Sequence, residues 1–306
     1  MRILRRLLLV LLALVLAATA ASFVYNAVTS DANVPVQELW HGKFVDGTAY
    51  REWGTHGPAI LLVGGFLEPT FVWDKVAPLL AIGYRVYALD LDGFGYTKRQ
   101  GPWTLAHWGD QVQQFIRALH LGKPIVVGHS LGAAVALEVA RRGGAAGAVL
   151  VDGDGLASGG PPRFLRVALV HTPFFTTLYR IARGWSWAVK RILKQAYGPA
   201  HPTLDSAEIH RWTNPLRAKD ALKAMQGIAE NGIAGFTRAK LRQIHVRALV
   251  VWGAADTVDP AAAGRQTAAD LHARFVEVPK AGHISMFSGS RQIALAIAGL
   301  SRGSSR

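Results

Sequence analysis

Short apolar runs alternate with amphipathic stretches from about residue 35 to the end of the chain. The apolar runs are rich in aliphatic and β-branched side chains, and each gives way to a glycine, an aspartate or a proline. They cover residues 58–63, 84–90, 124–127, 148–151, 247–252 and 273–278. Nearly continuous apolar strands of this kind are typical of a parallel sheet covered on both faces.

Helical periodicity fills most of the intervals between these runs. The expected helices cover residues 72–81, 104–119, 131–142, 261–271 and 291–300. Strands that alternate with helices in this way predict βαβ units, and therefore an α/β fold with a mostly parallel, doubly wound sheet. Residues 38–53, around Val45-Asp46-Gly47, predict a hairpin at an antiparallel edge of that sheet.

One interval is too long for a simple crossover. About 90 residues separate the runs that end at 151 and begin at 247, and a compact domain does not hold a structureless loop of that length. The interval includes helical stretches such as residues 178–197. We therefore expect a helical lid over residues 156–245, inserted into a core formed by residues 31–155 and 246–306.

The first 30 residues form a separate segment. Arg2, Arg5 and Arg6 precede an apolar run that extends from Leu7 to Val28. As a helix this run would span about 33 Å, enough to cross a bilayer core. We expect an uncleaved anchor with the folded part extracytoplasmic; the alternatives are a signal peptide cleaved near 18–20, leaving a secreted protein, and a buried helix.

Composition excludes some chemistry and leaves the surface open to two interpretations. The chain has no cysteine, so disulfides, thiolate nucleophiles and cysteine-ligated metals are excluded. Its net charge is +14, and residues 160–245 hold fourteen Lys and Arg against four acidic residues. This basic segment is compatible with anionic lipid headgroups as partners, or with a solvated face. No nucleic-acid motif accompanies the charge, so no nucleic-acid partner is expected.

Gly128-His129-Ser130-Leu131-Gly132 fits the pattern G-x-S-x-G of a nucleophile elbow. The pentapeptide alone is a weak signal, but here a buried strand precedes it and an alanine-rich amphipathic helix follows it. Strand, tight turn and helix are the context that the motif requires. We therefore interpret Ser130 as a nucleophile, and the neighbouring His129 as a packing residue of the turn.

An acid and a base follow in the order expected for such a serine. Asp256 comes after the strand at 247–252, and His283 after the strand at 273–278, so both are predicted at the carboxyl edge of the sheet. There His283 would deprotonate Ser130, and Asp256 would orient the imidazole. Asp152 or Asp154 could serve as the acid instead. Asp259 is a weaker candidate because it precedes Pro260, further from the strand end.

Two backbone N–H groups should stabilise the negative charge that develops during the reaction. Leu131, directly after the serine, supplies one, and Phe66 in Gly64-Gly65-Phe66 is the expected second donor. The alternative is that Gly64-Gly65 is only a tight turn. The remaining histidines are scattered without metal-ligand spacing, so we expect no metal and no other cofactor.

These residues resemble the α/β-hydrolase superfamily, in its lid-bearing branch of esterases, perhydrolases, carbon–carbon bond hydrolases and epoxide hydrolases. The resemblance covers about residues 38–155 and 245–300. Asp90-Leu-Asp-Gly-Phe-Gly95 is similar to the family turn Asp-x-Pro-Gly-x-Gly, with Asp92 in place of proline. Gly64-Gly65-Phe66 is similar to the His-Gly-x oxyanion loop, with glycine in place of histidine. The resemblance implies an α/β-hydrolase fold. Family epoxide hydrolases and haloalkane dehalogenases carry an aspartate as nucleophile, so Ser130 argues against both of these activities.

The expected activity is therefore hydrolysis of an ester-like acyl bond in an apolar small molecule near a membrane. The alternatives are carbon–carbon bond hydrolysis, perhydrolysis, or a non-catalytic binding module on the same fold. Aromatic residues of the insertion are candidates for an apolar acyl pocket, although each could equally belong to the core of the lid. These candidates are Phe174, Phe175, Trp185, Trp187 and Trp212.

Overall fold

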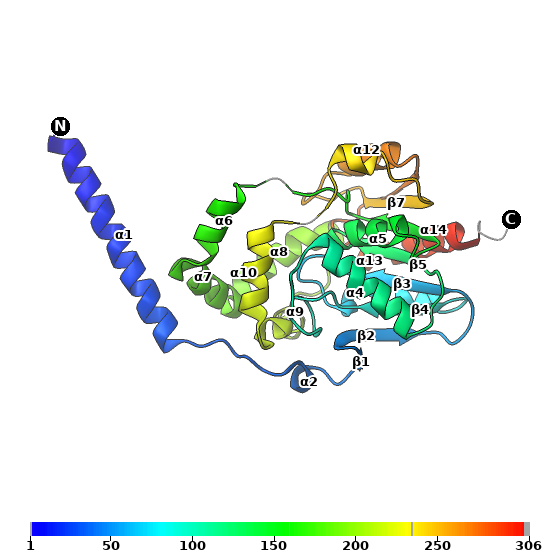
Figure 1. The fold of residues 1–306 in the computed structure, drawn as a ribbon, viewed down its shortest axis with the longest axis horizontal. Helices are drawn as coiled ribbons and strands as arrows, with labels where there is room; N and C mark the ends of the chain where they lie inside the picture. Colours follow the sequence, from blue (N-terminus) through cyan, green and yellow to red (C-terminus); the bar gives the residue numbers. More distant parts are fainter. Residues whose placement is uncertain (1, 159, 234, 303–306) are drawn as a thin grey trace.

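The computed structural model of the protein describes residues 2–158, 160–233 and 235–302. An eight-stranded sheet forms the core of the part that lies away from the N-terminal end of the chain (Figure 1). The strand order is β1-β2-β4-β3-β5-β6-β7-β8. Strands β1 and β2 form the predicted hairpin and pair antiparallel, and β2 is also antiparallel to β4. The other six strands, β3 to β8, are all parallel to one another. The strands are β1 Lys43–Val45, β2 Thr48–Trp53, β3 Ala59–Val63, β4 Arg85–Leu89, β5 Ile125–His129, β6 Gly147–Val151, β7 Ala248–Gly253 and β8 Arg274–Val278.

The central strands are apolar on both faces because helices cover both sides of the sheet. In β3, Leu61 and Val63 belong to one core, and Ile60 and Leu62 belong to the other. The first core is completed by α4 (Leu105–Ala118), α5 (Leu131–Arg141) and α12 (Ala261–Asp270), and the second by η1 (Thr70–Trp73), α3 (Ala77–Leu80), α13 (Ser285–Ser288) and α14 (Ser290–Arg302). The mostly parallel α/β architecture predicted from the sequence is confirmed.

The order of the strands places the candidate chemistry. From β3 the chain moves to β4 on one side of the sheet, and then returns to β5 on the other side of β3. Such a reversal leaves a crevice at the carboxyl ends of the strands, where ligands bind in open α/β sheets. Val63 at the end of β3 lies opposite Gly128 in β5. The Gly64-Gly65 turn and the Ser130 turn are therefore neighbours across this point.

Two predicted helices are wrong in their extent. The helix expected over 72–81 is instead η1 followed by the short α3, because Pro78 is tolerated only in the first turn of a helix. The helix expected over 178–197 is two helices, α7 (Pro173–Gly184) and α8 (Ser186–Tyr197). They are separated at Trp185, whose backbone (φ −94°, ψ 76°) is not helical, directly after Gly184.

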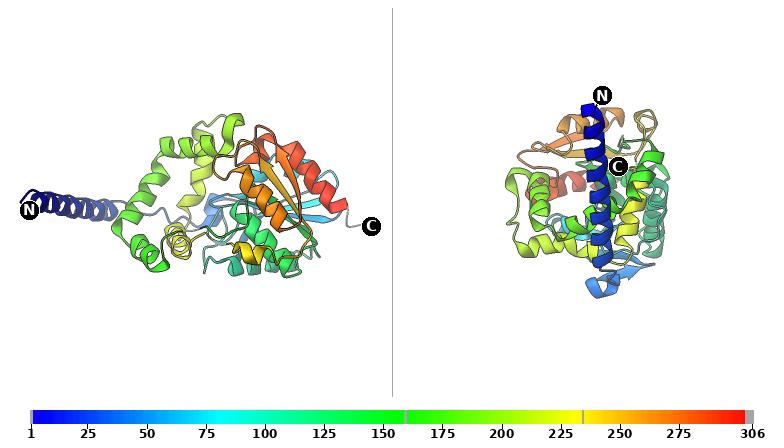
Figure 2. Two further views of the ribbon diagram at one scale, coloured as in Figure 1. Left: turned by 90° about the horizontal axis from the view of Figure 1, so that it is seen from above. Right: turned by 90° about the vertical axis from the view of Figure 1, so that its left-hand side faces the viewer.

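The interval between β6 and β7 is helical, as predicted, and lies between the sheet and the N-terminal helix (Figure 2). We call this interval the helical insertion. Besides α7 and α8 it contains α6 (Arg163–Val170), η2 (Gly198–Ala200), α9 (Ser206–Thr213), η3 (Asn214–Arg217), α10 (Ala221–Asn231) and α11 (Arg238–Leu241). The short helix α2 (Val36–Leu39) lies outside the insertion, in the connection between the N-terminal helix and β1.

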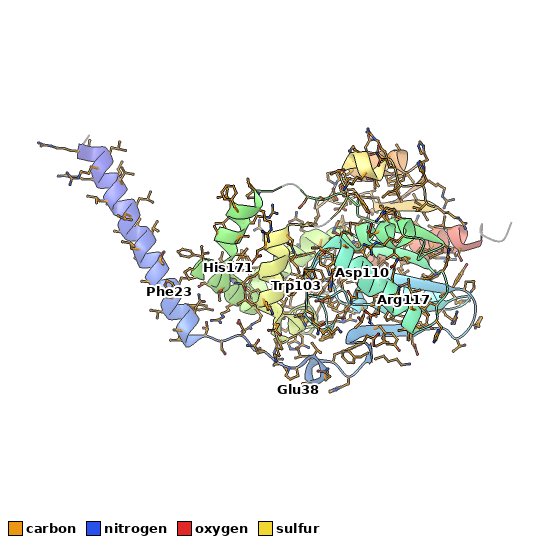
Figure 3. The ribbon with its side chains drawn as sticks, in the orientation of Figure 1. Phe23, Glu38, Trp103, Asp110, Arg117 and His171 are labelled. Carbon is orange, nitrogen blue, oxygen red and sulfur yellow. The ribbon has the colours of Figure 1, made fainter. Side chains whose placement is uncertain are left out.

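Helix α1 (Arg2–Val28) extends away from the rest of the protein (Figures 1 and 2). It is long and apolar enough to cross a membrane, with a mean hydropathy of 2.8 over its most apolar window, a property that signal sequences share. Most of its large apolar side chains are exposed, and that of Phe23, near the end that approaches α7, is 60% exposed (Figure 3). Only its last turns contact the folded part.

The contact between α1 and the helical insertion is polar. Ser22 hydrogen-bonds Thr177, and the Asn26 side chain donates to the carbonyl of Pro173, both on α7. Arg180, also on α7, donates to the carbonyl of Asn26 and pairs with Asp31. The base of α1 is thus held by α7. These contacts lie beyond residues 18–20, so cleavage there would preserve them.

Candidate active site

Ser130 occupies a sharp turn between β5 and α5. Its φ is +50°, a left-handed conformation that is strained for a residue with a side chain. The strand and the helix pass so closely that a Cβ on Gly128 would lie 1.9 Å from the carbonyl oxygen of Gly132. The Ser130 N–H donates to the carbonyl of Val151 (2.9 Å), which fixes the turn to β6. This is the geometry that the G-x-S-x-G pattern predicted.

Replacing Gly128 by alanine is expected to destabilise the protein by about 3 kcal/mol or more, because the added methyl group would overlap a rigid backbone carbonyl. Thermal or urea unfolding measures the change. Gly299→Ala is the matched control, since a Cβ there meets nothing within 4 Å. Equal stability of the two variants would contradict the predicted close approach of strand and helix.

His283 lies between Ser130 and Asp256. Its Nε2 is 3.1 Å from Ser130 Oγ, and its Nδ1 is 2.8 Å from Asp256 Oδ2. His283 and Asp256 are both buried, whereas Ser130 is half-buried and so partly open to the surface. The fold therefore brings together, in hydrogen-bonding order, three side chains that are distant in sequence. We call them the candidate triad.

The second oxygen of Asp256 is also held. Its Oδ1 accepts hydrogen bonds from the N–H groups of Val258 (2.8 Å) and Asp259 (2.9 Å). Each carboxylate oxygen thus has a fixed donor, so the group can rotate only by breaking a hydrogen bond. This arrangement can hold the imidazole with its proton on Nδ1 and its Nε2 lone pair toward the serine hydroxyl.

The alternative acids lie elsewhere. Asp152 faces Gly253, whose N–H donates to it (2.7 Å), and the hydroxyl of Ser285. Asp154 accepts from the N–H of Leu156 within its own turn. The side chain of Asp259 is half-buried, and burial, together with the charges of Asp154 and Asp256, raises its pKa to about 6. Of these carboxylates, the one that contacts His283 is that of Asp256.

The Gly64-Gly65-Phe66 turn lies directly beside Ser130. A Cβ on Gly65 would be 2.9 Å from that of Ser130, so only glycine permits this approach. Within the described residues, neither the Phe66 N–H nor the Leu131 N–H is assigned a protein acceptor. The Phe66 ring packs edge-on against Phe94, with centroids 5.4 Å apart. The two N–H groups proposed from the sequence are therefore available beside the serine.

Both departures from the family pattern have a structural counterpart. A Cβ on Gly64 would approach the carbonyl oxygen of Glu68 to 2.9 Å, so Glu68 fills the space beside this glycine. Asp92, in the position usual for proline, is buried and accepts hydrogen bonds from the ring nitrogens of Trp103 and His107, both at 2.9 Å. In the family pattern, the ring of the proline restricts the backbone of this turn. Here the hydrogen bonds of the Asp92 side chain hold the turn instead.

A buried charged cluster beneath the serine was not predicted. It consists of Glu68 in the loop after β3, His129 at the end of β5, and Asp152 in the loop after β6. Burial alone would lower the pKa of His129, but the charge and hydrogen bond of Glu68 raise it to about 9. The charge and hydrogen bond of His129 in turn outweigh burial and lower the pKa of Glu68, whereas burial raises that of Asp152 to about 6. His129 and Asp152 were singled out from the sequence, as a packing residue and an alternative acid, but Glu68 belongs to no motif and gave no signal.

The aromatic pocket candidates separate into different environments. Trp212 packs edge-on against Phe71, with ring centroids 5.0 Å apart. Phe71 follows shortly after the Gly64-Gly65-Phe66 turn. Trp185 and Trp187 contact each other and are 52% and 61% exposed. Phe174 and Phe175 lie on α7, the helix that holds α1, and are exposed and half-buried respectively. Trp212 alone among the five packs on a segment next to the candidate site.

The helical insertion also contacts the loop that carries His283. The N–H of Ile284 donates to the carbonyl of Ala196 in α8 (2.9 Å), and the rings of Tyr197 and Phe287 pack edge-on. Together with Trp212 on Phe71, these contacts join the insertion to the segments on two sides of the candidate triad. The insertion thus borders the carboxyl edge of the sheet.

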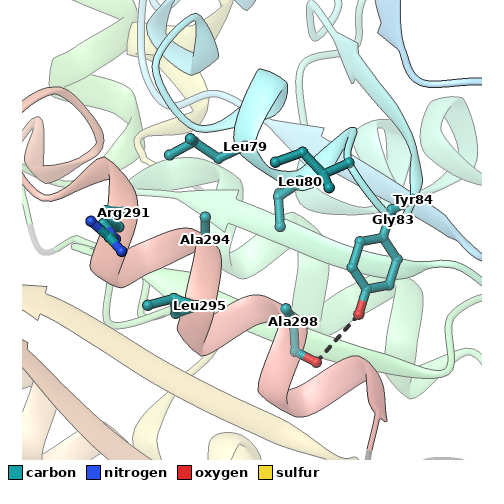
Figure 4. Close-up of a pocket in the computed structure, with 9 residues that line it drawn as sticks. Leu79, Leu80, Gly83, Tyr84, Arg291, Ala294, Leu295 and Ala298 are labelled. Atoms are coloured by element: carbon teal, nitrogen blue, oxygen red, sulfur yellow. Dashed lines mark hydrogen bonds between the residues drawn. The ribbon is translucent and has the colours of Figure 1, made fainter.

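A separate groove lies between α3 and α14, which cover one face of the sheet. It is lined by α3, α14 and Tyr84, which precedes β4, and has a volume of about 490 Å³ (Figure 4). No member of the candidate triad lines it. Among the described residues, no group of three or more His, Asp or Glu side chains could hold a metal ion.

The sequence profile of the Alpha/beta hydrolase family matches residues 24–296, which is most of the chain. This protein belongs to that family. The match includes the strands, the helical insertion and all members of the candidate triad, and it assigns the hydrolase to the superfamily that its motifs resemble.

Curated relatives of this hydrolase include two bacterial hydrolases. Uncharacterized hydrolase YugF of Bacillus subtilis is 24% identical over 69% of this chain and 78% of its own length. The 2-hydroxy-6-oxo-6-(2'-aminophenyl)hexa-2,4-dienoic acid hydrolase of Metapseudomonas resinovorans is 29% identical over 70% of this chain and 72% of its own.

Two solved structures share its fold. A thermophilic esterase from Thermogutta terrifontis has a TM-score of 0.68 at 23% identity, covering 84% of this chain and 93% of the other. A bacterial membrane phospholipase A has a TM-score of 0.67 at 21% identity, covering 97% and 98%. At these identities the similarity shows the fold alone. The family and the relatives together establish a hydrolase of the α/β fold.

Proposed function

We propose that this protein is a serine hydrolase that cleaves an ester-like acyl bond in an apolar small molecule. The observation that carries the proposal is the position of His283, whose two ring nitrogens lie 3.1 Å from Ser130 Oγ and 2.8 Å from Asp256 Oδ2. A serine hydroxyl is a weak nucleophile until a base removes its proton, and this geometry supplies that base.

The proposed reaction proceeds through an acyl-enzyme. His283 Nε2 takes the proton of Ser130 Oγ as that oxygen attacks the ester carbonyl. The N–H groups of Phe66 and Leu131 donate to the oxyanion, and Asp256 stabilises the imidazolium. The imidazolium protonates the leaving alcohol. His283 then deprotonates a water molecule, which attacks the acyl group. As the bond to Ser130 Oγ breaks, the imidazolium returns this proton to Ser130 and the acid is released.

A fluorophosphonate probe is expected to label the wild-type protein at Ser130, since such probes react with activated serines. p-Nitrophenyl esters should be hydrolysed. If an apolar pocket receives the acyl group, kcat/KM should rise with acyl chain length. Each added methylene that is buried contributes about 0.8 kcal/mol, or roughly a fourfold gain in kcat/KM. Mass spectrometry of labelled peptides and steady-state kinetics measure the two effects. A protein that is neither labelled nor active would instead support a non-catalytic binding module.

A second candidate activity is hydrolysis of a carbon–carbon bond. It is favoured by the Metapseudomonas resinovorans relative, which is named as a hydrolase of a 2-hydroxy-6-oxo dienoic acid. Labelling at Ser130 combined with turnover of such a compound, and absence of ester hydrolysis, would select this activity. The candidate triad would serve both reactions, or perhydrolysis, so the identity of the attacked bond has to come from substrates.

The membrane is the proposed location of this activity. Helix α1 would remain as an uncleaved anchor, with the catalytic part extracytoplasmic. The helical insertion would act as a lid at the bilayer surface. Its helices α6–α8 expose large apolar side chains beside basic ones, and α7 holds the base of α1. Apolar insertion and cationic attraction together are what an anionic bilayer surface favours.

Brominated lipids are expected to quench the fluorescence of Trp185 and Trp187 in the full-length protein reconstituted into anionic vesicles, because bromine quenches only indoles that reach the acyl chains. Replacing both residues by phenylalanine should remove most of the quenching that brominated lipids cause. Trp53→Phe, in β2 at the sheet, is the control and should leave it unchanged. Equal quenching in all three proteins would place the tryptophan pair away from the bilayer.

A further inference from the structure

The buried cluster of Glu68, His129 and Asp152 has no part in the proposed proton transfers, yet it adjoins every element of the candidate site. His129 is fully buried and is the residue before Ser130. Glu68 follows the Gly64-Gly65-Phe66 turn, and Asp152 follows β6. Burying three ionisable groups is costly unless they satisfy one another.

The two ring nitrogens of His129 both face hydrogen-bond acceptors. Nδ1 lies 2.6 Å from Glu68 Oε2, and Nε2 lies 2.8 Å from the backbone carbonyl oxygen of His283. A carbonyl oxygen can only accept, so Nε2 carries a proton. The pair of Nδ1 and Glu68 shares one further proton. Since the pKa of His129 is raised to about 9 and that of Glu68 is lowered, this proton resides on the imidazole at neutral pH.

Other ionisable groups around His129 support the same protonation state. Asp152 Oδ2 lies 3.8 Å from Nε2, and it accepts from the hydroxyl of Ser285, so it adds a second acidic neighbour. The ring of His283 is 5.0 Å away between centroids, and its own nitrogens face Ser130 and Asp256. Among the residues that the structure describes, Glu68, Asp152 and His283 are the titratable groups found to face His129, and two of the three are carboxyls.

The same contacts connect the loops of the candidate site. Glu68 Oε2 also accepts from the N–H of Gly65 (2.7 Å), the residue before Phe66. His129 is covalently joined to Ser130, and its Nε2–H holds the carbonyl of His283. One imidazolium thus fixes the oxyanion turn, the nucleophile and the base relative to each other.

We propose that His129 is a positioning residue: a doubly protonated imidazolium that, through Glu68 and the carbonyl of His283, sets the distance between the oxyanion donors, Ser130 and the catalytic base. This inference rests on the proposed serine hydrolase activity. Misplacing reacting groups by about 1 Å can lower a rate about 100-fold without changing substrate affinity. The expected signature of losing His129 is therefore a fall in kcat with little change in KM.

Two substitutions and their combination test the proposal in the full-length protein with p-nitrophenyl esters. His129→Phe keeps a ring but removes both donors, and should lower kcat about 10- to 100-fold with KM changed less than about twofold. Glu68→Gln keeps the shape and hydrogen-bonding oxygen but removes the charge, and should lower kcat about tenfold. The double variant should be no slower than His129→Phe alone, because both substitutions remove one interaction.

Glu138→Gln is the matched control. Glu138 is also a buried carboxylate paired with cations, Arg141 and Arg142, but it lies on α5 two turns beyond Ser130. Its substitution should lower the melting temperature and leave kcat unchanged. If Glu138→Gln lowers kcat as much as Glu68→Gln, or if the losses in the double variant add, the effect is general destabilisation and the proposal is overturned.

Nitrogen-15 NMR of the histidine rings provides a readout that does not need activity. In the wild type at pH 7.5, both ring nitrogens of His129 should show the chemical shifts of an imidazolium. The Glu68→Gln substitution should lower the pKa of His129. A neutral ring in the wild type overturns the proposal even if His129→Phe fails to fold. Absence of fluorophosphonate labelling and of any turnover, with an imidazolium still observed, would refute the proposed hydrolase activity instead.

Discussion

Replacing Ser130 by alanine is expected to lower kcat for ester hydrolysis by roughly 10⁵-fold, because the nucleophile is lost while the oxyanion donors and the pocket remain. Fluorophosphonate labelling should disappear. The fold should be retained, since the one hydrogen bond made by the Ser130 hydroxyl among the described residues is that with His283 Nε2. Kinetics, labelling and thermal unfolding of the purified variant measure these effects.

Ser206→Ala is the appropriate control, because Ser206 is an exposed serine at the start of α9. It should retain full activity and labelling. Residual esterase activity of Ser130→Ala close to that of the wild type, at equal purity, would mean that another group attacks the ester. In that case the proposal of a serine nucleophile would have to be abandoned, although the family assignment would not change.

The Asp256→Asn substitution is expected to lower kcat by roughly 10³- to 10⁴-fold through a change of tautomer. The N–H groups of Val258 and Asp259 both donate to Oδ1, so the amide oxygen of asparagine must occupy that position. Its NH₂ group then faces His283 Nδ1 and forces that nitrogen to accept. The imidazole proton moves to Nε2, which can no longer take the proton of Ser130.

Asp259→Asn tests the same region without this effect. Asp259 is three residues further on, and it contributes its backbone N–H, which the substitution preserves, to the hydrogen bond with Asp256. We expect its kcat to remain within about twofold of the wild type. If Asp259→Asn were the more damaging of the two, the acid would be misassigned. Steady-state kinetics above pH 7, where the Asp259 carboxyl with its pKa of about 6 is ionised, provide the comparison.

The strands could be predicted from the sequence because they are buried on both faces. A run such as residues 59–63 is apolar at every position, and glycine or aspartate terminates it at the sheet edge. Helix limits were less predictable. Pro78 and Gly184 interrupt stretches whose apolar periodicity continues across them, and local propensity decided those breaks. The helical character of the insertion was recognisable, whereas its position against α1 was not.

The sequence by itself determined the fold class and a short list for the candidate site. The G-x-S-x-G pattern between a strand and a helix, and an aspartate and a histidine after later strands, are local features that can be read in chain order. They place candidates at one edge of a sheet because all parallel strands end there. Helix α1 was equally evident, since a long apolar segment needs no tertiary context.

Only the tertiary structure decided which carboxylate lies against His283 and which groups surround His129. Asp152 and Asp256 both follow strands, but the chain turns the first toward Gly253 and Ser285 and the second toward the imidazole. Glu68 carries no motif, and its pairing with His129 joins residues 61 positions apart. Such contacts depend on how neighbouring loops pack. No local pattern of residues indicates which side chains so far apart in sequence will meet.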